Sequence, residues 1–147
     1  MLSTILSREF IRYLNETHSS ADVLSLPQQL IPIPLHPQRL RERGFNQALE
    51  IALTLSRFSG IAVNNSLVYR TRYTPSQSQL NAEDRSTNLK RAFKLKEPTT
   101  SLNLKHLVIV DDVVTTMATG NAIAEVLKSA GVERVDFWAI ARASFHP

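Results

Sequence analysis

The hydrophobic pattern of this chain alternates between helical and strand-like segments. Apolar residues recur at helical spacing in residues 1–15, 45–57 and 123–130, which predicts an N-terminal helix within residues 1–20 and two later amphipathic helices. Gly60 and Gly131 follow the later two and are expected to end them. The face that we expect the second helix to bury consists of Phe45, Leu49, Ala52, Leu53 and Ser56.

Strand-like segments lie between these helices. We expect a short strand within residues 29–34, whose two prolines argue against a fully laddered central strand or place its end where the chain leaves the sheet. Further strands are predicted within residues 61–69, 92–95, 106–110 and 135–141, and the one at 92–95 is expected to return to the same sheet. This alternation predicts an α/β fold, a mostly parallel β-sheet flanked by helices on both faces, in one domain over residues 1–147.

Two polar segments interrupt the pattern. Residues 71–91, which we call the hood, are rich in Ser, Gln, Asn and Thr, and a long polar loop of this kind often forms a flexible active-site lid. Residues 35–43 read as a basic loop containing Arg39, Arg41 and Arg43. We expect Arg43 at the start of a helix, where the dipole disfavours a cation unless an anion is bound. A structural role and a ligand-binding role for Arg43 both stay open.

Composition narrows the class of protein. The chain has 147 residues, 43% hydrophobic and 20% charged, which excludes a disordered chain. It has no cysteine, which excludes a disulfide framework and a thiolate zinc site. No apolar run is long enough for a membrane span, and Arg8, Glu9 and Arg12 argue against a signal peptide, so we expect a cytoplasmic protein. The net charge of +4 suits either nucleic acid or a polyphosphate ligand.

The candidate chemistry lies in residues 107–120. Four apolar residues lead into Asp111 and Asp112, and two valines then lead into a hydroxyl-rich turn before a helix. The N–H groups and dipole at a helix start suit a phosphate, and the carboxylates suit ribose hydroxyls or Mg²⁺ bridging to further phosphates. Adjacent carboxylates serve one ligand only if the strand is already ending, because strand neighbours point to opposite faces. The alternative is an acid that only caps a helix.

The glycines exclude competing phosphate-binding folds. The four glycines stand at positions 44, 60, 120 and 131, so neither a G-x-x-x-x-G-K-[ST] nor a G-x-G-x-x-G motif is present. A receiver-type phosphoacceptor would place its acid pair near the first strand, whereas this pair precedes the last predicted helix. P-loop, dinucleotide-binding and receiver folds are therefore excluded.

Residues 108–119, with Leu107 before them, resemble the phosphoribosyl-pyrophosphate signature of type I phosphoribosyltransferases: four apolar residues, two acids, two apolar residues, two hydroxyl residues, two small residues and a hydroxyl. Three further segments are similar to the ComF/GntX branch of that superfamily. They are Ile33-Pro34-Leu35-His36, Arg43-Gly44-Phe45-Asn46-Gln47-Ala48, and Arg70-Thr71-Arg72 followed by Gln77, Arg85, Asn88 and Ala92-Phe93. The resemblance covers residues 30–142 and implies a type I phosphoribosyltransferase-like fold with a flexible hood.

The resemblance also implies a role for each matching residue. Asp111 and Asp112 would hold the ribose hydroxyls, with Mg²⁺ at Asp111, directly or through water. Arg85, or else Arg72, would reach over the site from the hood, so the expected catalytic residues are Asp111, Asp112 and Arg85. The expected substrate-binding residues also include Leu35 and His36 in a pyrophosphate loop, Arg43, and the 5-phosphate turn of Thr115, Thr116, Met117, Ala118 and Thr119.

The chain departs from the family pattern in two ways. Met117 stands where the signature usually has glycine, which would allow positive φ and a close approach to phosphate. The N-terminal cysteine-rich zinc ribbon that is usual in ComF-like proteins has no counterpart here, because the chain has no cysteine. Apart from these, His36 and His106 read as ordinary polar residues and Trp138 as a core residue.

Three functions stay open. The leading hypothesis is a Mg²⁺-dependent enzyme that transfers the phosphoribosyl group of phosphoribosyl pyrophosphate to an unidentified acceptor. The second is a non-catalytic sensor of a phosphoribosyl ligand, which Met117 favours. The third, which the ComF resemblance and the basic charge favour, is a competence or DNA-uptake protein that contacts single-stranded DNA or the competence machinery. A homodimer is a further expectation.

Overall fold

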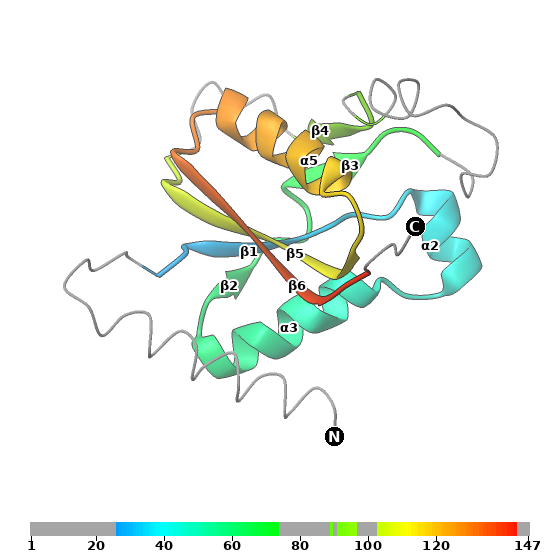
Figure 1. Cartoon of the computed structure of the whole chain (residues 1–147), viewed down its shortest axis with the longest axis horizontal. Helices are drawn as coiled ribbons and strands as arrows, with labels where there is room; N and C mark the ends of the chain where they lie inside the picture. Colours follow the sequence, from blue (N-terminus) through cyan, green and yellow to red (C-terminus); the bar gives the residue numbers. More distant parts are fainter. Residues whose placement is uncertain (1–25, 74–88, 90, 97–102, 144–147) are drawn as a thin grey trace.

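The computed structural model describes residues 26–73, 89, 91–96 and 103–143 (Figure 1). The predicted N-terminal helix and most of the predicted hood, Arg85 included, lie outside the described residues. Within the described part, the order of elements alternates between strands and helices as the hydrophobic pattern predicts.

A four-stranded sheet forms the centre of the fold, in the order β2-β1-β5-β6. Its strands are β1 (Gln29–Pro32), β2 (Ala62–Val63), β5 (His106–Val114) and β6 (Arg134–Arg142). Every neighbouring pair in this sheet is parallel, which confirms the predicted α/β architecture. Pro32 is the last residue of the central strand β1, so the prolines do mark the place where the chain leaves the sheet.

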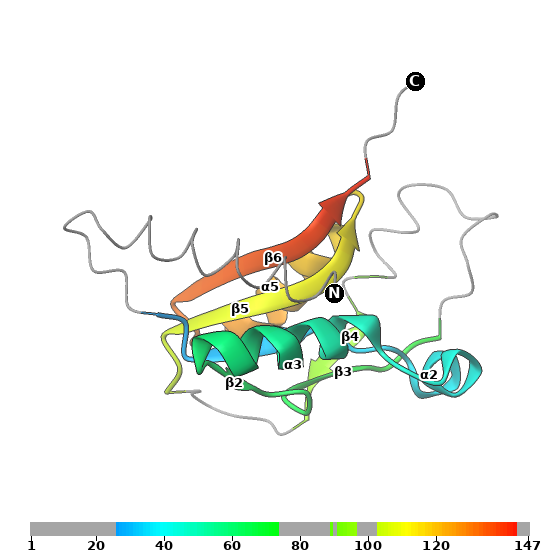
Figure 2. The ribbon, with the colours of Figure 1, turned by 90° about the horizontal axis from the view of Figure 1, so that it is seen from below.

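Helices cover both faces of this sheet, as predicted. Alternate residues of β5 point to opposite sides: Leu107 and Ile109 pack towards α5 (Ala118–Ser129), and Val108 and Val110 pack towards α3 (Gln47–Ser59). Figure 2 shows α3 on one side of the sheet and α5 behind it on the other. All four of these β5 side chains are essentially buried, so the strand that leads into the acid pair is held from both faces.

The strand predicted within residues 92–95 does not return to the main sheet, and that expectation is wrong. It forms β4 (Phe93–Leu95), which pairs antiparallel with β3 (Val68–Arg70) in a separate two-stranded sheet. Backbone bonds extend the pair, from Thr71 N–H to the Ala92 carbonyl at 2.7 Å. Phe93 is buried in the same cluster as the α5 side chains, so this small sheet adds to the layer on the α5 side.

Residues 37–43 form a helix, α2 (Pro37–Arg43), and the predicted basic loop is wrong for them. His36 caps the start, where its Nδ1 accepts a hydrogen bond from the Gln38 N–H at 3.2 Å, and Pro37 supplies a φ suited to the first turn. Gly44 ends the helix with a φ of 82°. Arg43 therefore lies at a helix end rather than a helix start, and there the dipole favours a cation.

The second predicted helix is α3, and it ends before Gly60 as expected. Its buried residues are Ala48, Ala52 and Leu55, whereas Phe45 and Leu53 are 52% and 40% exposed. The predicted face is therefore wrong by about one position. Asn46 caps α3, so the helix begins at Gln47 and Phe45 lies before it, whereas the pattern placed Phe45 inside the helix.

Close packing joins α5 to β6. Gly120 lies in the first turn of α5, and a Cβ there would lie 2.6 Å from Cε2 of Phe137 in β6. Glycine therefore lets the helix approach the strand. Ile123 and Leu127 are fully buried beneath it, and Gly131 follows with a φ of 95°, which confirms the predicted helix and its end.

Candidate functional site

The two aspartates lie where the sheet narrows. β1 pairs with β5 only as far as Pro32 opposite Val110, and Asp111 is the next residue of β5. β5 continues to Val114 beside β6, so the expectation that it ends at Val110 is wrong. The strand that does end beside Val110 is β1, the neighbour of β5 in the sheet. This opens the carboxyl edge of the sheet on one side of β5, the position where parallel sheets usually bind ligands.

Each aspartate is held by its neighbour's backbone. Asp111 Oδ1 accepts a hydrogen bond from the Asp112 N–H, and Asp112 Oδ1 accepts one from the Val113 N–H, both at 2.8 Å. No Lys or Arg of the described residues forms an ion pair with either carboxylate. Burial, together with the neighbouring Asp112 carboxyl, raises the pKa of Asp111 to about 6, although the backbone hydrogen bond opposes this. The pair thus forms a half-buried acidic site without a counter-cation.

The turn after β5 combines exposed hydroxyls with a strained residue. Thr115 and Thr116 are exposed and Thr119 is half-buried in the first turn of α5. Met117 has φ 58° and ψ 2°, the left-handed region, and no other non-glycine residue of the described part has a positive φ. A side chain in this region costs about 1 kcal/mol. The first N–H groups of α5 have no partner within the helix, so the turn offers donors to an anion.

A second loop lies at the same edge of the sheet. Leu35 and His36 connect β1 to α2, and just before them the Ile33 N–H donates to the Val110 carbonyl at 3.0 Å. The side-chain amide of Asn46 donates to the Ile33 carbonyl, also at 3.0 Å. The end of β1, Val110 within β5 and the start of α3 are therefore joined at one point.

Known proteins resemble this chain in sequence and in fold, although no family model matches it. It is 39% identical over 133 residues to competence protein F of Haemophilus influenzae, covering 90% of this chain and 56% of that protein. It is 40% identical over 119 residues to the DNA utilization protein YhgH of Escherichia coli K12, covering 81% of this chain and 51% of that protein. The chain spans about half the length of the curated relatives it matches.

The fold is that of type I phosphoribosyltransferases. Adenine phosphoribosyltransferase of Saccharomyces cerevisiae superposes with a TM-score of 0.61 at 13% identity, over 97% of this chain and 69% of that one. Purine phosphoribosyltransferase of Pyrococcus horikoshii gives a TM-score of 0.54 at 18% identity, over 98% and 76%. The chain is therefore ComF-like in sequence, similar to competence protein F and to YhgH, and type I phosphoribosyltransferase-like in fold.

This ComF-like chain brings most of the predicted site residues to one edge of the sheet. The acid pair, the turn of residues 115–119 and the loop of Leu35 and His36 all lie at the carboxyl ends of β5 and β1. Arg43 is the last residue of α2, the helix that follows this loop. The roles given to these residues stay predictions.

Two residues support the loop beside the site. Asn46 caps α3 and donates a hydrogen bond to the Ile33 carbonyl. Tyr73, which the sequence analysis did not single out, places its ring 5.5 Å from that of His36, and its hydroxyl lies 3.3 Å from both carboxylate oxygens of Glu42. Tyr73 thereby fixes the first residues of the hood against α2. Its aromatic character within a polar segment was the signal that could have identified it.

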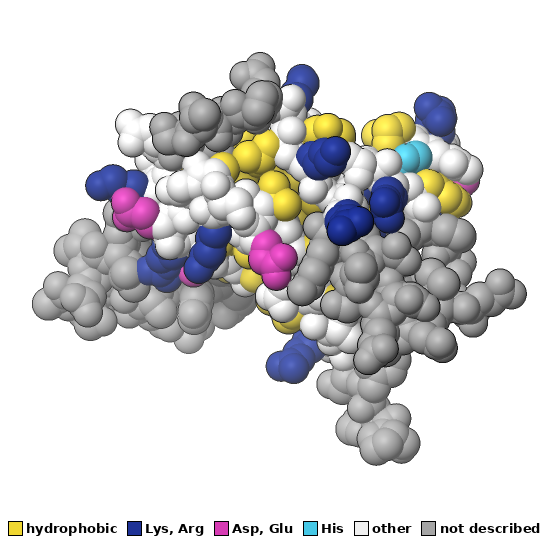
Figure 3. All heavy atoms as spheres, turned by 90° about the horizontal axis from the view of Figure 1, so that it is seen from above, with side chains coloured by type: hydrophobic (Ala, Val, Ile, Leu, Met, Phe, Trp, Pro, Cys, Tyr) yellow, Lys and Arg dark blue, Asp and Glu magenta, His cyan; other side chains and the backbone are white. Residues whose placement is uncertain are grey.

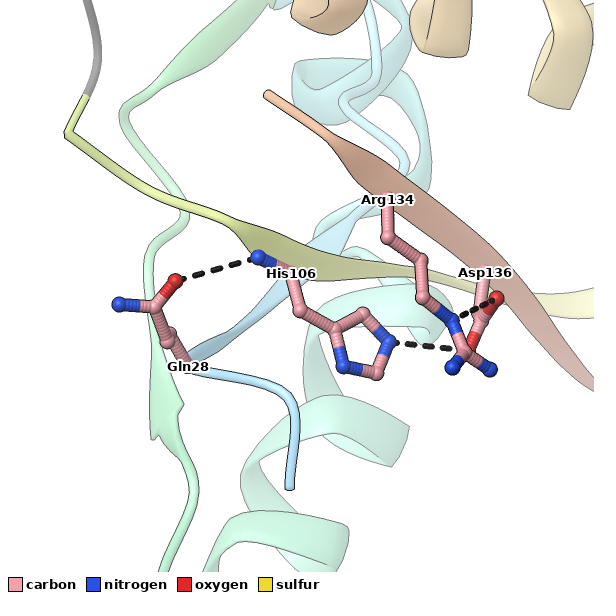
Figure 4. Close-up of polar contacts among 4 residues, drawn as sticks. All are labelled: Gln28, His106, Arg134 and Asp136. Atoms are coloured by element: carbon pink, nitrogen blue, oxygen red, sulfur yellow. Dashed lines mark hydrogen bonds and ion pairs between the residues drawn. The ribbon is translucent and has the colours of Figure 1, made fainter. Parts of the chain in front are cut away.

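A second polar cluster lies at the amino end of β5 (Figure 4). His106 Nε2 and Arg134 Nη2 lie 2.9 and 2.8 Å from Asp136 Oδ2, and Gln28 accepts a hydrogen bond from the His106 N–H at 3.1 Å. Although burial alone would raise it, the hydrogen bonds and charges of Arg134 and His106 hold the pKa of Asp136 below its usual range. His106 is therefore a paired structural residue, consistent with the expectation of an ordinary polar role.

None of the helices in the described residues is both long and apolar enough to cross a bilayer.

Proposed function

We propose that this ComF-like chain binds phosphoribosyl pyrophosphate with Mg²⁺ at the carboxyl ends of β1 and β5 and transfers the phosphoribosyl group to an acceptor. The observation that carries the proposal is the adjacent pair Asp111 and Asp112, placed where β1 ends and directly before the turn into α5. The family and fold favour the same ligand, since the structural neighbours are named phosphoribosyltransferases.

The carboxylates suit the ribose. Each aspartate keeps one oxygen on a backbone N–H and leaves the second oxygen without a hydrogen bond from the described residues. β5 continues past both residues, but its pairing with β6 includes Asp111 and Val113 and leaves out Asp112. We expect this interruption of the ladder to let the free oxygens of both neighbours accept hydrogen bonds from the 2- and 3-hydroxyls of one sugar. Because hydroxyl donors replace water without adding charge, they allow a half-buried carboxylate to stay ionised.

The turn suits the 5-phosphate. The exposed Thr115 and Thr116 hydroxyls and the unpaired N–H groups at the start of α5 are donors that a phosphate requires. The left-handed Met117 bends the backbone there, as a glycine would. The expected pyrophosphate loop, Leu35 and His36, faces the site from the end of β1.

The donor set also fits Mg²⁺. This ion prefers carboxylate oxygens and keeps several waters, so one or two protein carboxylates and the substrate's phosphates suffice. The described residues contain no cluster of three or more metal-ligating side chains, which agrees with a shared protein–substrate site rather than a closed protein cage. Asp111 would hold the ion, directly or through water, and the bound ion would neutralise the charge of the pyrophosphate.

In the expected reaction, the role of the chain is to position its substrate and to shield it from water. Breaking the bond between ribose C1 and pyrophosphate leaves a cationic sugar and a highly anionic leaving group. The aspartates orient the ribose and lie near the developing positive charge, and the turn fixes the phosphate end. A closing hood, with Arg85, would exclude water as a competing nucleophile.

Calorimetry of phosphoribosyl pyrophosphate with Mg²⁺ against wild type and Asp112→Asn tests the proposal. We expect binding by wild type and strongly weakened binding by the variant. Absence of binding by wild type would refute the proposal. Pyrophosphate release over a panel of bases and amines then tests transfer separately from binding.

Met117 favours a second candidate, a protein that binds the same ligand as a sensor without turnover. Its side chain is 38% exposed and lies directly before α5, where the family usually has glycine. Ligand binding without pyrophosphate release in wild type, and release that begins in Met117→Gly, would support this candidate over the enzyme.

A further inference from the structure

β6 is a long strand at the edge of the main sheet. It has nine residues and, among the described residues, pairs only with β5, and Figure 2 shows it as the outermost strand. The opposite edge strand, β2, has only two residues. Natural sheets commonly protect an open edge with a short strand, a proline or a lysine. β2 is protected in this way, whereas β6 is long and contains neither proline nor lysine.

The open edge of β6 offers backbone groups and apolar side chains. The Arg134 N–H donates to the carbonyl of Lys105, directly before β5, at 2.7 Å, so alternation along the strand directs the N–H and carbonyl of Val135 to the open side. None of the nine residues is buried, and Ile140 is 44% exposed. Seen from the α5 side, apolar side chains also reach the surface in the middle of the molecule, with charged ones around them (Figure 3). Such an edge is suited to pairing with a further strand.

The side chains of β6 are complementary to a second copy of the same strand. When two copies run antiparallel with Ala139 at the centre, Asp136 lies opposite Arg142 of the second copy, and Trp138 lies opposite Ile140. These four side chains lie on one face of the sheet, because they are an even number of residues apart. Opposite charges, and an aromatic ring facing a β-branched side chain, are pairs that stabilise neighbouring antiparallel strands. Two-fold symmetry provides each of these pairs twice.

The charges select this register. A pairing centred on Trp138 would instead place Arg134 opposite Arg142, and like charges directly opposite each other destabilise a sheet. Arg142 is exposed and forms no ion pair with any residue in the described ranges, so its charge is available to a partner. Asp136 keeps 31% of its side chain exposed beside Arg134 and His106 (Figure 4), so an additional cation can reach it.

We propose that the chain forms a two-fold dimer through β6, in which the two strands pair antiparallel about Ala139 and join both sheets into one. A two-fold interface presents the same surface from each copy, and a self-complementary strand meets this requirement. An extended strand of another protein can also add to a sheet edge. The match of Asp136 with Arg142 within one strand favours a second copy. The homodimer expected from the sequence is thereby assigned a surface, a symmetry and a register.

Sedimentation velocity across micromolar protein concentrations tests for the dimer. We expect wild type to associate, and Arg142→Glu to raise the dissociation constant roughly thirtyfold, because it places two acids opposite each other in both symmetric pairs. Ala139→Lys should abolish the dimer, since it sets two cations face to face at the symmetry axis and leaves a monomer with an exposed lysine. Arg57→Glu makes the same change of charge at an exposed residue of α3, and this matched control should dimerise as wild type does.

A single cysteine tests the register, because the chain has none of its own. The thiol of Ala139→Cys would lie directly opposite that of its copy, at a Cα separation of about 5 Å, and should form an intermolecular disulfide under mild oxidation. In Ala141→Cys the two thiols would lie on the same face but about 13 Å apart, too far for a disulfide. Ala141→Cys is therefore the matched control for cross-linking.

The proposal is overturned by a wild type that stays monomeric at every concentration, which would leave the edge to a strand of another protein. It is equally overturned by a dimer that Arg142→Glu and Ala139→Lys leave intact, or by one in which Ala139→Cys cross-links no faster than Ala141→Cys. Far-ultraviolet circular dichroism checks that each variant is folded. Asp112→Asn should dimerise as wild type does, so this proposal and the proposed phosphoribosyl function can fail independently.

Discussion

At its amino end β5 places His106 beside Asp136 and Arg134, and at its carboxyl end it places Asp111 beside Asp112. Both sites hold partly buried charged groups on the same strand. At the amino end, Arg134 and His106 hold the pKa of Asp136 below its ordinary value, although burial alone would raise it. At the carboxyl end, the described residues offer the acids backbone N–H groups but no cation, and burial together with the Asp112 carboxyl raises the pKa of Asp111 to about 6.

We interpret the paired charges at the amino end of β5 as stabilising the fold, and the acids at its carboxyl end as groups available to a ligand. A paired cluster lowers the free energy of the folded state, whereas two neighbouring, half-buried carboxylates without a cation raise it. Sites that bind ligands often carry such a cost, because the ligand supplies the missing partners. The strained Met117 adds to the cost at the same end of the strand.

The largest expected effect is on ligand affinity at the carboxyl end. Asp112→Asn should weaken the binding of phosphoribosyl pyrophosphate with Mg²⁺ roughly a hundredfold, about 3 kcal/mol, because a charged acceptor of ribose hydroxyls is lost. Calorimetry measures the effect. Asp136→Asn is the matched control, and equal losses of affinity in both variants would remove the distinction between the two ends.

Asp136→Asn should instead destabilise the fold, by about 1.5 kcal/mol near neutral pH, because it leaves the buried His106 without its charged partner. The folded pKa of Asp136 lies below its unfolded value, so its contribution is present above that unfolded value, about 3.9, and is lost as pH falls through the folded pKa. Urea denaturation near pH 7 and at a pH well below about 3.9 should show the deficit shrinking in acid. Glu125→Gln, an exposed acid on α5, should cost nothing at either pH.

Met117→Gly should relieve the strain of the turn and stabilise the fold by about 1 kcal/mol, measured by thermal unfolding. We also expect tighter binding of the phosphate, since the backbone can approach more closely. Met117→Ala keeps the backbone strain and controls for loss of the side chain. An unchanged or weaker ligand affinity in Met117→Gly would mean that the turn is adapted to methionine.

Asp111→Asn should give the smallest effect, a gain in stability of roughly 0.5–1 kcal/mol near pH 7.5, reduced for solvent screening of this half-exposed group. The folded pKa of about 6 lies above the unfolded value, so the ionised carboxylate destabilises the fold fully above pH 6 and not at all below about pH 4. Chemical denaturation across this range should show the gain declining in acid. A loss of stability near neutral pH would show that Asp111 supports the fold.

Much of the fold was predictable from the hydrophobic pattern. The alternation in β5 and the periodicity of α5 reflect burial on two faces and on one face, and burial is what the pattern reports. The place of the acid pair and its turn, after a buried strand and before a helix, was also predictable, and their role as a phosphate site stays a prediction.

The errors lie where local hydrogen bonding or long-range pairing decides the structure. Pro37 and the His36 cap form α2 without a buried face, so no apolar period marks it. β4 pairs with β3 rather than with the main sheet, and a strand's partner is not visible in its own sequence. The pairing of His106 with Asp136 depends on the register of β5 against β6, which brings together residues 30 positions apart.

The most direct test of the difference between the two ends of β5 is a map of amide chemical shifts during titration with phosphoribosyl pyrophosphate and Mg²⁺. We expect perturbed amides in residues 111–119 and at Leu35 and His36, with those of Gln28, His106 and Asp136 unmoved. Unperturbed amides in residues 111–119 at saturating ligand, or shifts centred on His106, would contradict the assignment of the carboxyl end of β5 as the ligand site.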